Sequence, residues 1–110
     1  MRILVVGHTY VARANWAKWL ALLRLDREVQ ILAVAPERWR EPGYGAEQRS
    51  PAEVRDRFEF RPLPVYARGG RYLFAPGPII AQLRAYQPDI VHVEEEPWSL
   101  PFLEVAAARR

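Results

Sequence analysis

An uninterrupted apolar run near the start of the chain, Ile3 to Val6, constrains the fold more than any other feature. A short strand with apolar residues at every position is buried on both faces, which is typical of a parallel sheet covered by helices. A second run, Val29 to Val34, which is apolar except at Gln30, follows after a helical pattern. The order strand, helix, strand predicts a right-handed crossover between two neighbouring parallel strands.

The segment between the two runs, Ala12 to Leu25, is expected to be the first helix. Trp16, Trp19, Leu20 and Leu23 recur at helical spacing and form one apolar stripe. We expect the tryptophans of this stripe to pack on the sheet. The alternative is that Trp16 and Trp19, beside basic residues, dock on an anionic membrane surface.

The remaining segments extend the same plan. Alternation predicts a half-exposed strand over Arg57 to Tyr66, and its prolines place that strand at a sheet edge. Further elements are a helical turn at Ser50 to Glu53, a helix over Gly77 to Gln87, a strand over Asp89 to Val93 and a helix from about Ser99 onward. Glu37 to Arg49 and Ala67 to Ala75 are expected to be loops. The sum predicts one α/β domain, residues 1–110, with a Rossmann-like open parallel sheet of order 3-2-1-4 and helices on both faces.

Composition excludes several classes of protein. Cysteine is absent, so no disulfide framework or thiolate metal site is expected, which fits a reducing cytosol. The apolar run at the start of the chain is too short to be the core of a signal peptide, and no apolar run in the sequence approaches the length of a membrane span. The net charge is +3, but the basic residues, all Arg except Lys18, are scattered, so nucleic acid is not expected as a partner.

Two polar segments follow the first and last predicted strands. The loop Gly7 to Tyr10 has a single glycine and lacks the G-x-G-x-x-G fingerprint of dinucleotide-binding folds, so no nucleotide cofactor is expected there. Glu94, Glu95 and Glu96 come directly after the strand Asp89 to Val93. Ligands in open α/β sheets bind beyond the carboxyl ends of the strands, so both segments lie where a site is expected.

Four segments together carry a resemblance to a known family: R-I-L-V-V-G-H at 2–8, A-P-E-R-W at 35–39, L-P-V-Y at 63–66 and P-D-I-V-H-V-E-E-E-P-W-S-L at 88–100. The chain resembles the N-terminal part of bacterial family-4 glycosyltransferases, retaining enzymes of the two-domain GT-B architecture. The resemblance implies a truncated half of that fold, which holds the acceptor. A nucleotide sugar would be bound mainly by a C-terminal domain that is absent from this sequence.

The resemblance also implies site residues. Gly7, His8, Thr9 and Tyr10 would face the cleft, and Glu94, Glu95, Glu96 and Trp98 would lie near the transferred sugar. Many relatives carry H-x-H at the end of the fourth strand, where this chain has His92-Val93-Glu94. The partners implied are a nucleotide sugar and a glycan or lipid acceptor, in the cytoplasm or at the inner face of the membrane, and the isolated chain is not expected to transfer sugar.

Alternatives remain open for the polar residues. The three glutamates accept hydrogen bonds from sugar hydroxyls, or they form a solvated turn that caps the next helix; a metal site with His8 and His92 has no supporting ligand spacing. His92 is expected to be a hydrogen-bonded core residue. Arg68 and Arg71 are solvated loop charges or contacts for an anionic acceptor group. The strand Ile90 to Val93 would be an apolar edge, covered by a partner, a second copy or the final helix.

Overall fold

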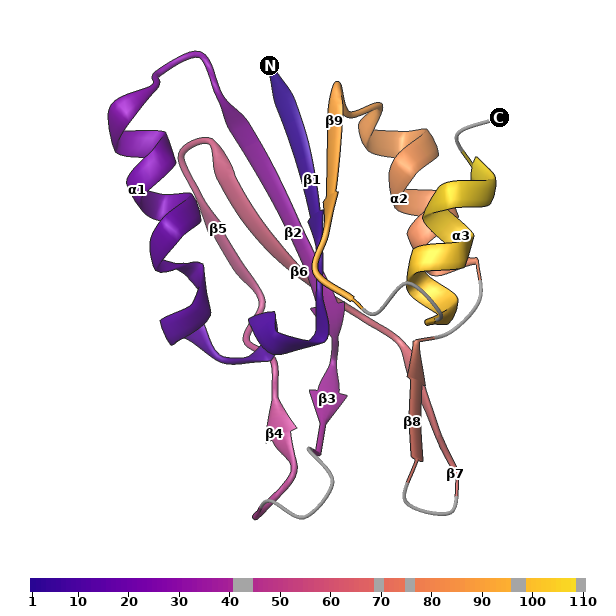
Figure 1. Cartoon of the computed structure of the whole chain (residues 1–110). Helices are drawn as coiled ribbons and strands as arrows, with labels where there is room; N and C mark the ends of the chain where they lie inside the picture. Colours follow the sequence, from indigo (N-terminus) through magenta and orange to yellow (C-terminus); the bar gives the residue numbers. More distant parts are fainter. Residues whose placement is uncertain (41–44, 69–70, 75–76, 96–98, 109–110) are drawn as a thin grey trace.

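A computed structural model describes residues 1–40, 45–68, 71–74, 77–95 and 99–108 (Figure 1). The chain forms three α-helices and nine strands in these ranges. The strands are β1 Arg2–Val6, β2 Gln30–Pro36, β3 Arg38–Trp39, β4 Gln48–Arg49, β5 Glu53–Arg55, β6 Phe58–Leu63, β7 Val65–Arg68, β8 Arg71–Phe74 and β9 Ile90–Val93. The helices are α1 Ala17–Leu25, α2 Pro78–Tyr86 and α3 Leu100–Ala108.

The main sheet has five strands in the order β5-β6-β2-β1-β9. β6, β2, β1 and β9 are parallel, and Leu4 of β1 aligns with Leu32 of β2 and with Val91 of β9. These four strands lie in the order expected from the sequence. β5 adds an antiparallel strand outside β6, so the strand carrying Pro62 is not the edge. The chain is therefore a mixed α/β protein with a mostly parallel sheet.

The first face of the sheet is covered by α1 and the two 3₁₀ turns that precede it, His8–Val11 and Arg13–Trp16. Trp16 is buried between the helix and the sheet, with its ring 4.6 Å from that of Phe60, and its Nε1 donates to the carbonyl of Tyr10. The expectation that tryptophan packs on the sheet is confirmed for Trp16. The helix itself starts later than expected, because Ala12 adopts an extended conformation that separates the two 3₁₀ turns.

The second face is covered by α2 and α3 (Figure 1). Ile79 of α2 and Val105 of α3 pack with Leu4 and Val6 of β1. Glu104 joins the two helices, because its carboxylate accepts hydrogen bonds from the backbone N–H groups of Gly77 at 2.7 Å and Ile80 at 3.4 Å. A carboxylate at a helix N-terminus also interacts favourably with the helix dipole. No helix in the described ranges is long and apolar enough to cross a membrane.

The segment between β2 and α2 differs most from the sequence-based expectation. Ser50 opens no helical turn: its hydroxyl donates to the carbonyl of Pro36 at 2.6 Å, and Glu53 begins β5. The expected loop Glu37 to Arg49 contains a short hairpin, β3–β4. The expected strand over Arg57 to Tyr66 ends at Leu63 as β6, and a second hairpin, β7–β8, begins at Val65 and extends into the expected loop Ala67 to Ala75. The strands of these two hairpins have two to four residues each, too few for a period to be visible in the sequence.

Candidate functional site at the carboxyl edge of the sheet

The loops that follow β1 and β9 meet at the carboxyl edge of the sheet. The backbone N–H of Glu94 donates to the carbonyl of Val6 at 2.8 Å, so the last residues of both strands stay side by side. Gly7 permits this approach: a Cβ atom there would lie 2.9 Å from the ring of Tyr10 and 3.3 Å from the carbonyl of Glu94. The glycine is thus explained by close packing at the point where the two loops converge.

His8 and Glu95 form the best-buried polar pair of the site. The carboxylate of Glu95 accepts a hydrogen bond from the backbone N–H of His8 at 2.6 Å and lies 2.9 Å from the imidazole Nδ1. Its side chain is only 5% exposed, and a buried carboxylate requires such donors. Because a carboxylate only accepts, the hydrogen is assigned to Nδ1 of His8. Glu95 therefore fixes both the tautomer and the orientation of the ring.

A small open hollow lies beside this pair, with a volume of about 260 Å³. The ring of Trp39 forms part of its wall, 4.7 Å from the ring of His8. The other wall residues come from the 3₁₀ turns and the β3–β4 hairpin: Thr9, Val11, Ala12, Asn15, Ala46 and Gln48. The hollow thus offers an aromatic ring, a fixed imidazole and the polar side chains of a threonine, an asparagine and a glutamine.

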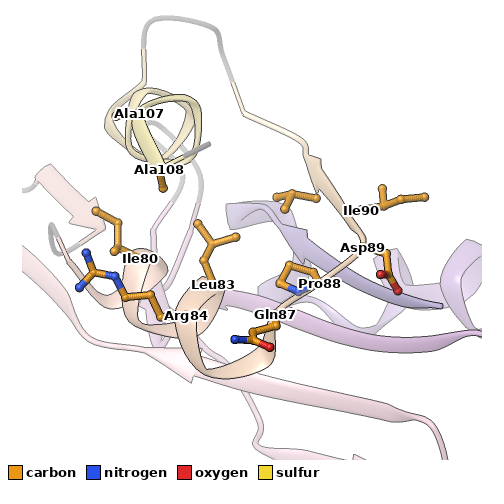
Figure 2. Close-up of a pocket in the computed structure, with 10 residues that line it drawn as sticks. Ile80, Leu83, Arg84, Gln87, Pro88, Asp89, Ile90, Ala107 and Ala108 are labelled. Atoms are coloured by element: carbon orange, nitrogen blue, oxygen red, sulfur yellow. The ribbon is translucent and has the colours of Figure 1, made fainter. Parts of the chain in front are cut away.

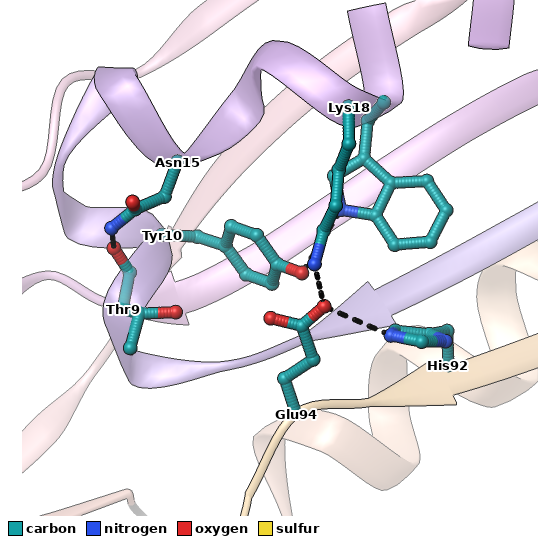
Figure 3. A network of polar contacts seen from close by, with 7 residues as sticks. Thr9, Tyr10, Asn15, Lys18, His92 and Glu94 are labelled. Atoms are coloured by element: carbon teal, nitrogen blue, oxygen red, sulfur yellow. Dashed lines mark hydrogen bonds and ion pairs between the residues drawn. The ribbon is translucent and has the colours of Figure 1, made fainter.

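Glu94 points into a second polar network, on the side of α1 (Figure 3). It forms an ion pair with Lys18 and lies 3.0 Å from Nε2 of His92. Tyr10 adds a hydrogen bond to Glu94, and the hydroxyl of Tyr10 accepts one from Nε1 of Trp19 at 2.9 Å. Lys18, Glu94, Thr9 and neighbouring residues of the 3₁₀ turn and α1 line a further open hollow of about 370 Å³.

The network changes the acidity of two of its members. Partial burial raises the pKa of Glu94, but the hydrogen bonds from Lys18, Tyr10 and His92 together outweigh it and lower this pKa to about 2. Burial raises the pKa of Tyr10 well above its usual value, against the opposing effect of the Trp19 hydrogen bond. Glu94 is therefore ionised throughout the physiological range, and Tyr10 keeps its proton.

Several expectations for these residues need correction. His92 is hydrogen-bonded as expected, but its side chain is 43% exposed and does not belong to the core. Glu94 and Glu95 bond to Lys18 and His8 and do not cap α3, where the hydroxyl of Ser99 accepts from the N–H of Phe102 at 3.3 Å. No group of three or more His, Cys, Asp or Glu within the described ranges is arranged to hold a metal ion.

Other predicted site residues fall outside what the structure describes. Glu96 and Trp98 lie outside the described residues. Arg68 and Arg71 face each other across the β7–β8 hairpin in backbone register, and their side chains are not among those described. The site as described therefore consists of Gly7, His8, Thr9, Tyr10, Glu94 and Glu95 from the expected set.

Two contributors were not singled out from the sequence. Lys18, whose side chain is 54% exposed, also pairs with Glu94. Trp39 follows β2 by three positions, so the rule that sites lie beyond the carboxyl ends of parallel strands was a signal for it. No protein-family model matches this chain, and neither a curated protein nor a solved structure does so.

Proposed function

We propose that this chain is the acceptor-binding half of a retaining glycosyltransferase, a Rossmann-like domain that works with a donor-binding domain on another polypeptide segment. The observation that supports it is the His8–Glu95 pair at the carboxyl edge of the sheet, where the loops after β1 and β9 converge. These two residues are 87 positions apart in the sequence.

The groups around this pair match the chemistry of a sugar. Sugar hydroxyls both donate and accept hydrogen bonds, and the C–H faces of the ring are apolar. Glu94 offers an ionised carboxylate, Thr9 an exposed hydroxyl and His8 an oriented imidazole, while Trp39 offers an aromatic ring. Glu94 replaces a histidine in the family pattern, so it would accept a hydrogen bond from an acceptor hydroxyl.

The shape of the hollows supports a two-domain arrangement. At about 260 and 370 Å³, both lie at or below the low end of the ~300–1,000 Å³ typical of small-molecule pockets. They are also open to solvent and share Thr9 and Asn15 in their walls. A cleft closed by a second domain would supply the missing wall and exclude water from the reaction.

The test is a titration of the 110-residue chain with a panel of mono- and disaccharides, in which NMR chemical shifts report binding. We expect saccharide-dependent shifts that centre on residues 7–11 and 94–95, with weaker binding in His8→Ala. Asp56→Asn, at the opposite end of the sheet, is the control and should bind as the unmodified chain does. The absence of any saccharide-dependent shift, or sugar transfer by the chain without an added domain, would contradict the proposal.

The alternative is a non-catalytic binding or assembly module with the same fold. The observation that favours it is the apolar edge of β9, where Ile90 is 45% exposed. This alternative predicts self-association or protein binding without any response to saccharides or nucleotide sugars. The same titration therefore separates the two functions.

A further inference from the structure

A further polar hollow lies at the amino end of the sheet, opposite the candidate site. Two turns meet there: the one that joins α1 to β2 and the one that joins β5 to β6 (Figure 1). The backbone N–H of Ile31 donates to the carbonyl of Arg57 at 2.8 Å, which holds the second turn against the start of β2. The hollow between the turns has a volume of about 380 Å³. It shares no residue with the loops that follow β1 and β9.

The lining of this hollow is mostly positive. It consists of Leu23, Arg24, Arg27, Asp56 and Arg57, so three guanidinium groups and one carboxylate give a net charge of +2. Arg24 and Arg27 are exposed, and no ion pair joins either of them to a residue of the described ranges. The side chain of Asp56 is 94% exposed and lies 3.8 Å from Nε of Arg57, so solvent screens its charge. The hollow thus carries more positive charge than its own residues compensate.

Arg57 is held in place by the main chain around it. Its guanidinium donates to the carbonyls of Leu23 at 2.8 Å, Asp26 at 2.9 Å and Val29 at 3.2 Å. Its φ of 62° lies in the left-handed region, where a residue other than glycine is uncommon and persists only when surrounding contacts fix it. Arg57 is therefore a fixed positive charge, with a side chain that is only 26% exposed.

The contacts of Arg57 also remove an obstacle to the binding of an anion. The last carbonyl groups of a helix lack partners within the helix and form its negative pole, which repels anions. α1 ends at Leu25, and Arg57 donates to the carbonyl of Leu23 and to that of Asp26, just beyond the helix. Because Arg57 satisfies these carbonyls, the charges of Arg24 and Arg27 are left for a ligand.

We propose that this hollow binds a phosphate group, with Arg24 and Arg27 in direct contact with it and Arg57 as the fixed charge beside them. Arginine suits this ligand because its planar guanidinium donates two parallel hydrogen bonds to phosphate oxygens. At about 380 Å³, the hollow is near the low end of the ~300–1,000 Å³ typical of small-molecule pockets, which fits a phosphate or diphosphate group. The proposal is independent of the acceptor-binding function, because the two sites lie at opposite ends of the sheet.

A larger hollow elsewhere in the protein provides the matched control. It has a volume of about 880 Å³ and is lined by residues of α2, β9 and α3 (Figure 2). Arg84 of α2 is the one arginine among its lining residues, and Asp89 balances that charge. Arg84 is exposed, as Arg24 is. Replacing Arg84 by glutamine therefore removes the same charge from the protein without altering the proposed phosphate site.

The test is an NMR titration of the chain with sodium pyrophosphate at constant ionic strength. We expect saturable shifts of the backbone N–H signals of the two turns. Arg24→Gln and Arg27→Gln should each weaken binding by about threefold to tenfold, because each removes a charge-assisted contact that is exposed to solvent. Asp56→Asn should strengthen binding by about twofold to fivefold, since it removes a carboxylate that repels the ligand. Arg84→Gln should bind as the unmodified chain does.

Phosphate groups occur in soluble compounds and in lipid headgroups, and co-sedimentation with vesicles that contain phosphatidic acid distinguishes the two sources. Co-sedimentation that pyrophosphate reverses and Arg24→Gln weakens indicates a headgroup. Saturable pyrophosphate binding without co-sedimentation indicates a soluble phosphate compound. Shifts that do not saturate, an equal loss of binding in Arg24→Gln and Arg84→Gln, or no gain in Asp56→Asn would each overturn the proposal, whatever the result of the saccharide titration.

Discussion

Replacing Glu94 by glutamine should destabilise the protein at neutral pH and remove part of its acid sensitivity. The substitution keeps the shape of the side chain but deletes the charge that pairs with Lys18 and accepts hydrogen bonds from Tyr10 and His92. In the folded chain the pKa of Glu94 is lowered from the usual 4.5 to about 2. A group with a lowered folded pKa stabilises the fold above its unfolded pKa and loses this contribution as pH falls through the folded pKa.

The magnitude follows from the same values. The difference between 4.5 and about 2 corresponds to at most about 3 kcal/mol of unfolding free energy. The Lys18 side chain is 54% exposed, and solvent screens its ion pair with Glu94. We therefore expect Glu94→Gln to cost about 1–2 kcal/mol near pH 7, with the cost decreasing between pH 4.5 and about 2.

Urea unfolding of the unmodified chain and of Glu94→Gln, at about pH 7 and about pH 2.5, measures this difference in unfolding free energy. For a domain of this size, a loss of 1–2 kcal/mol lowers the urea midpoint by roughly 0.5–1 M. The difference in unfolding free energy between the two proteins should be large at neutral pH and small at the acidic value. Glu28→Gln, at an exposed position, is the control and should have little effect. If the difference for Glu94→Gln is the same at both pH values, the network does not hold Glu94 ionised.

Two further substitutions test the packing around this network. Tyr10→Phe leaves the N–H of Trp19 without its phenolic acceptor, so we expect a loss of about 1–2 kcal/mol in unfolding free energy, and an unchanged urea midpoint would contradict it. Gly7→Ala places a Cβ atom 2.9 Å from the ring of Tyr10, and we expect it to lower thermal stability by about 1–3 kcal/mol and to shift NMR signals of residues 7–10. A stability equal to that of the unmodified chain would show that this contact is not tight.

The parts of the fold that could be predicted from the sequence are those with a clear local pattern. β1 and β2 each contain a run of at least four consecutive apolar residues, and α2 begins at a proline that follows Gly77, so their positions were close to those observed. Ser50 to Glu53 matched a capping box, but a hydroxyl that donates to the carbonyl of Pro36 is a tertiary contact that no local pattern reveals. The start of α1 was also mispredicted, because two 3₁₀ turns, the second ending at the buried Trp16, precede the helix.

The site was predictable as a place but not as a set of contacts. The rule on strand ends located both the His8 loop and the glutamate turn at one edge of the sheet. This rule gave no reason to expect His8 to pair with Glu95 and not with the adjacent glutamates. Lys18 lies on α1, whose start was mispredicted, and it contacts Glu94 across 76 positions of the sequence, which no local pattern reveals.

Glu94 and Glu95 have different partners because of the conformation of the backbone. Successive residues of an extended chain point to opposite sides, so Glu94 pairs with Lys18 of α1 while Glu95 pairs with His8. Glu95 is almost fully buried, and both of its carboxylate oxygens contact Nδ1 of His8. Glu95 is therefore a residue that positions the His8 ring. Glu94 is more exposed and lines an open hollow, so it is the carboxylate that a ligand would reach. A ligand that binds here should therefore contact Glu94 directly and depend on Glu95 only through the orientation of His8.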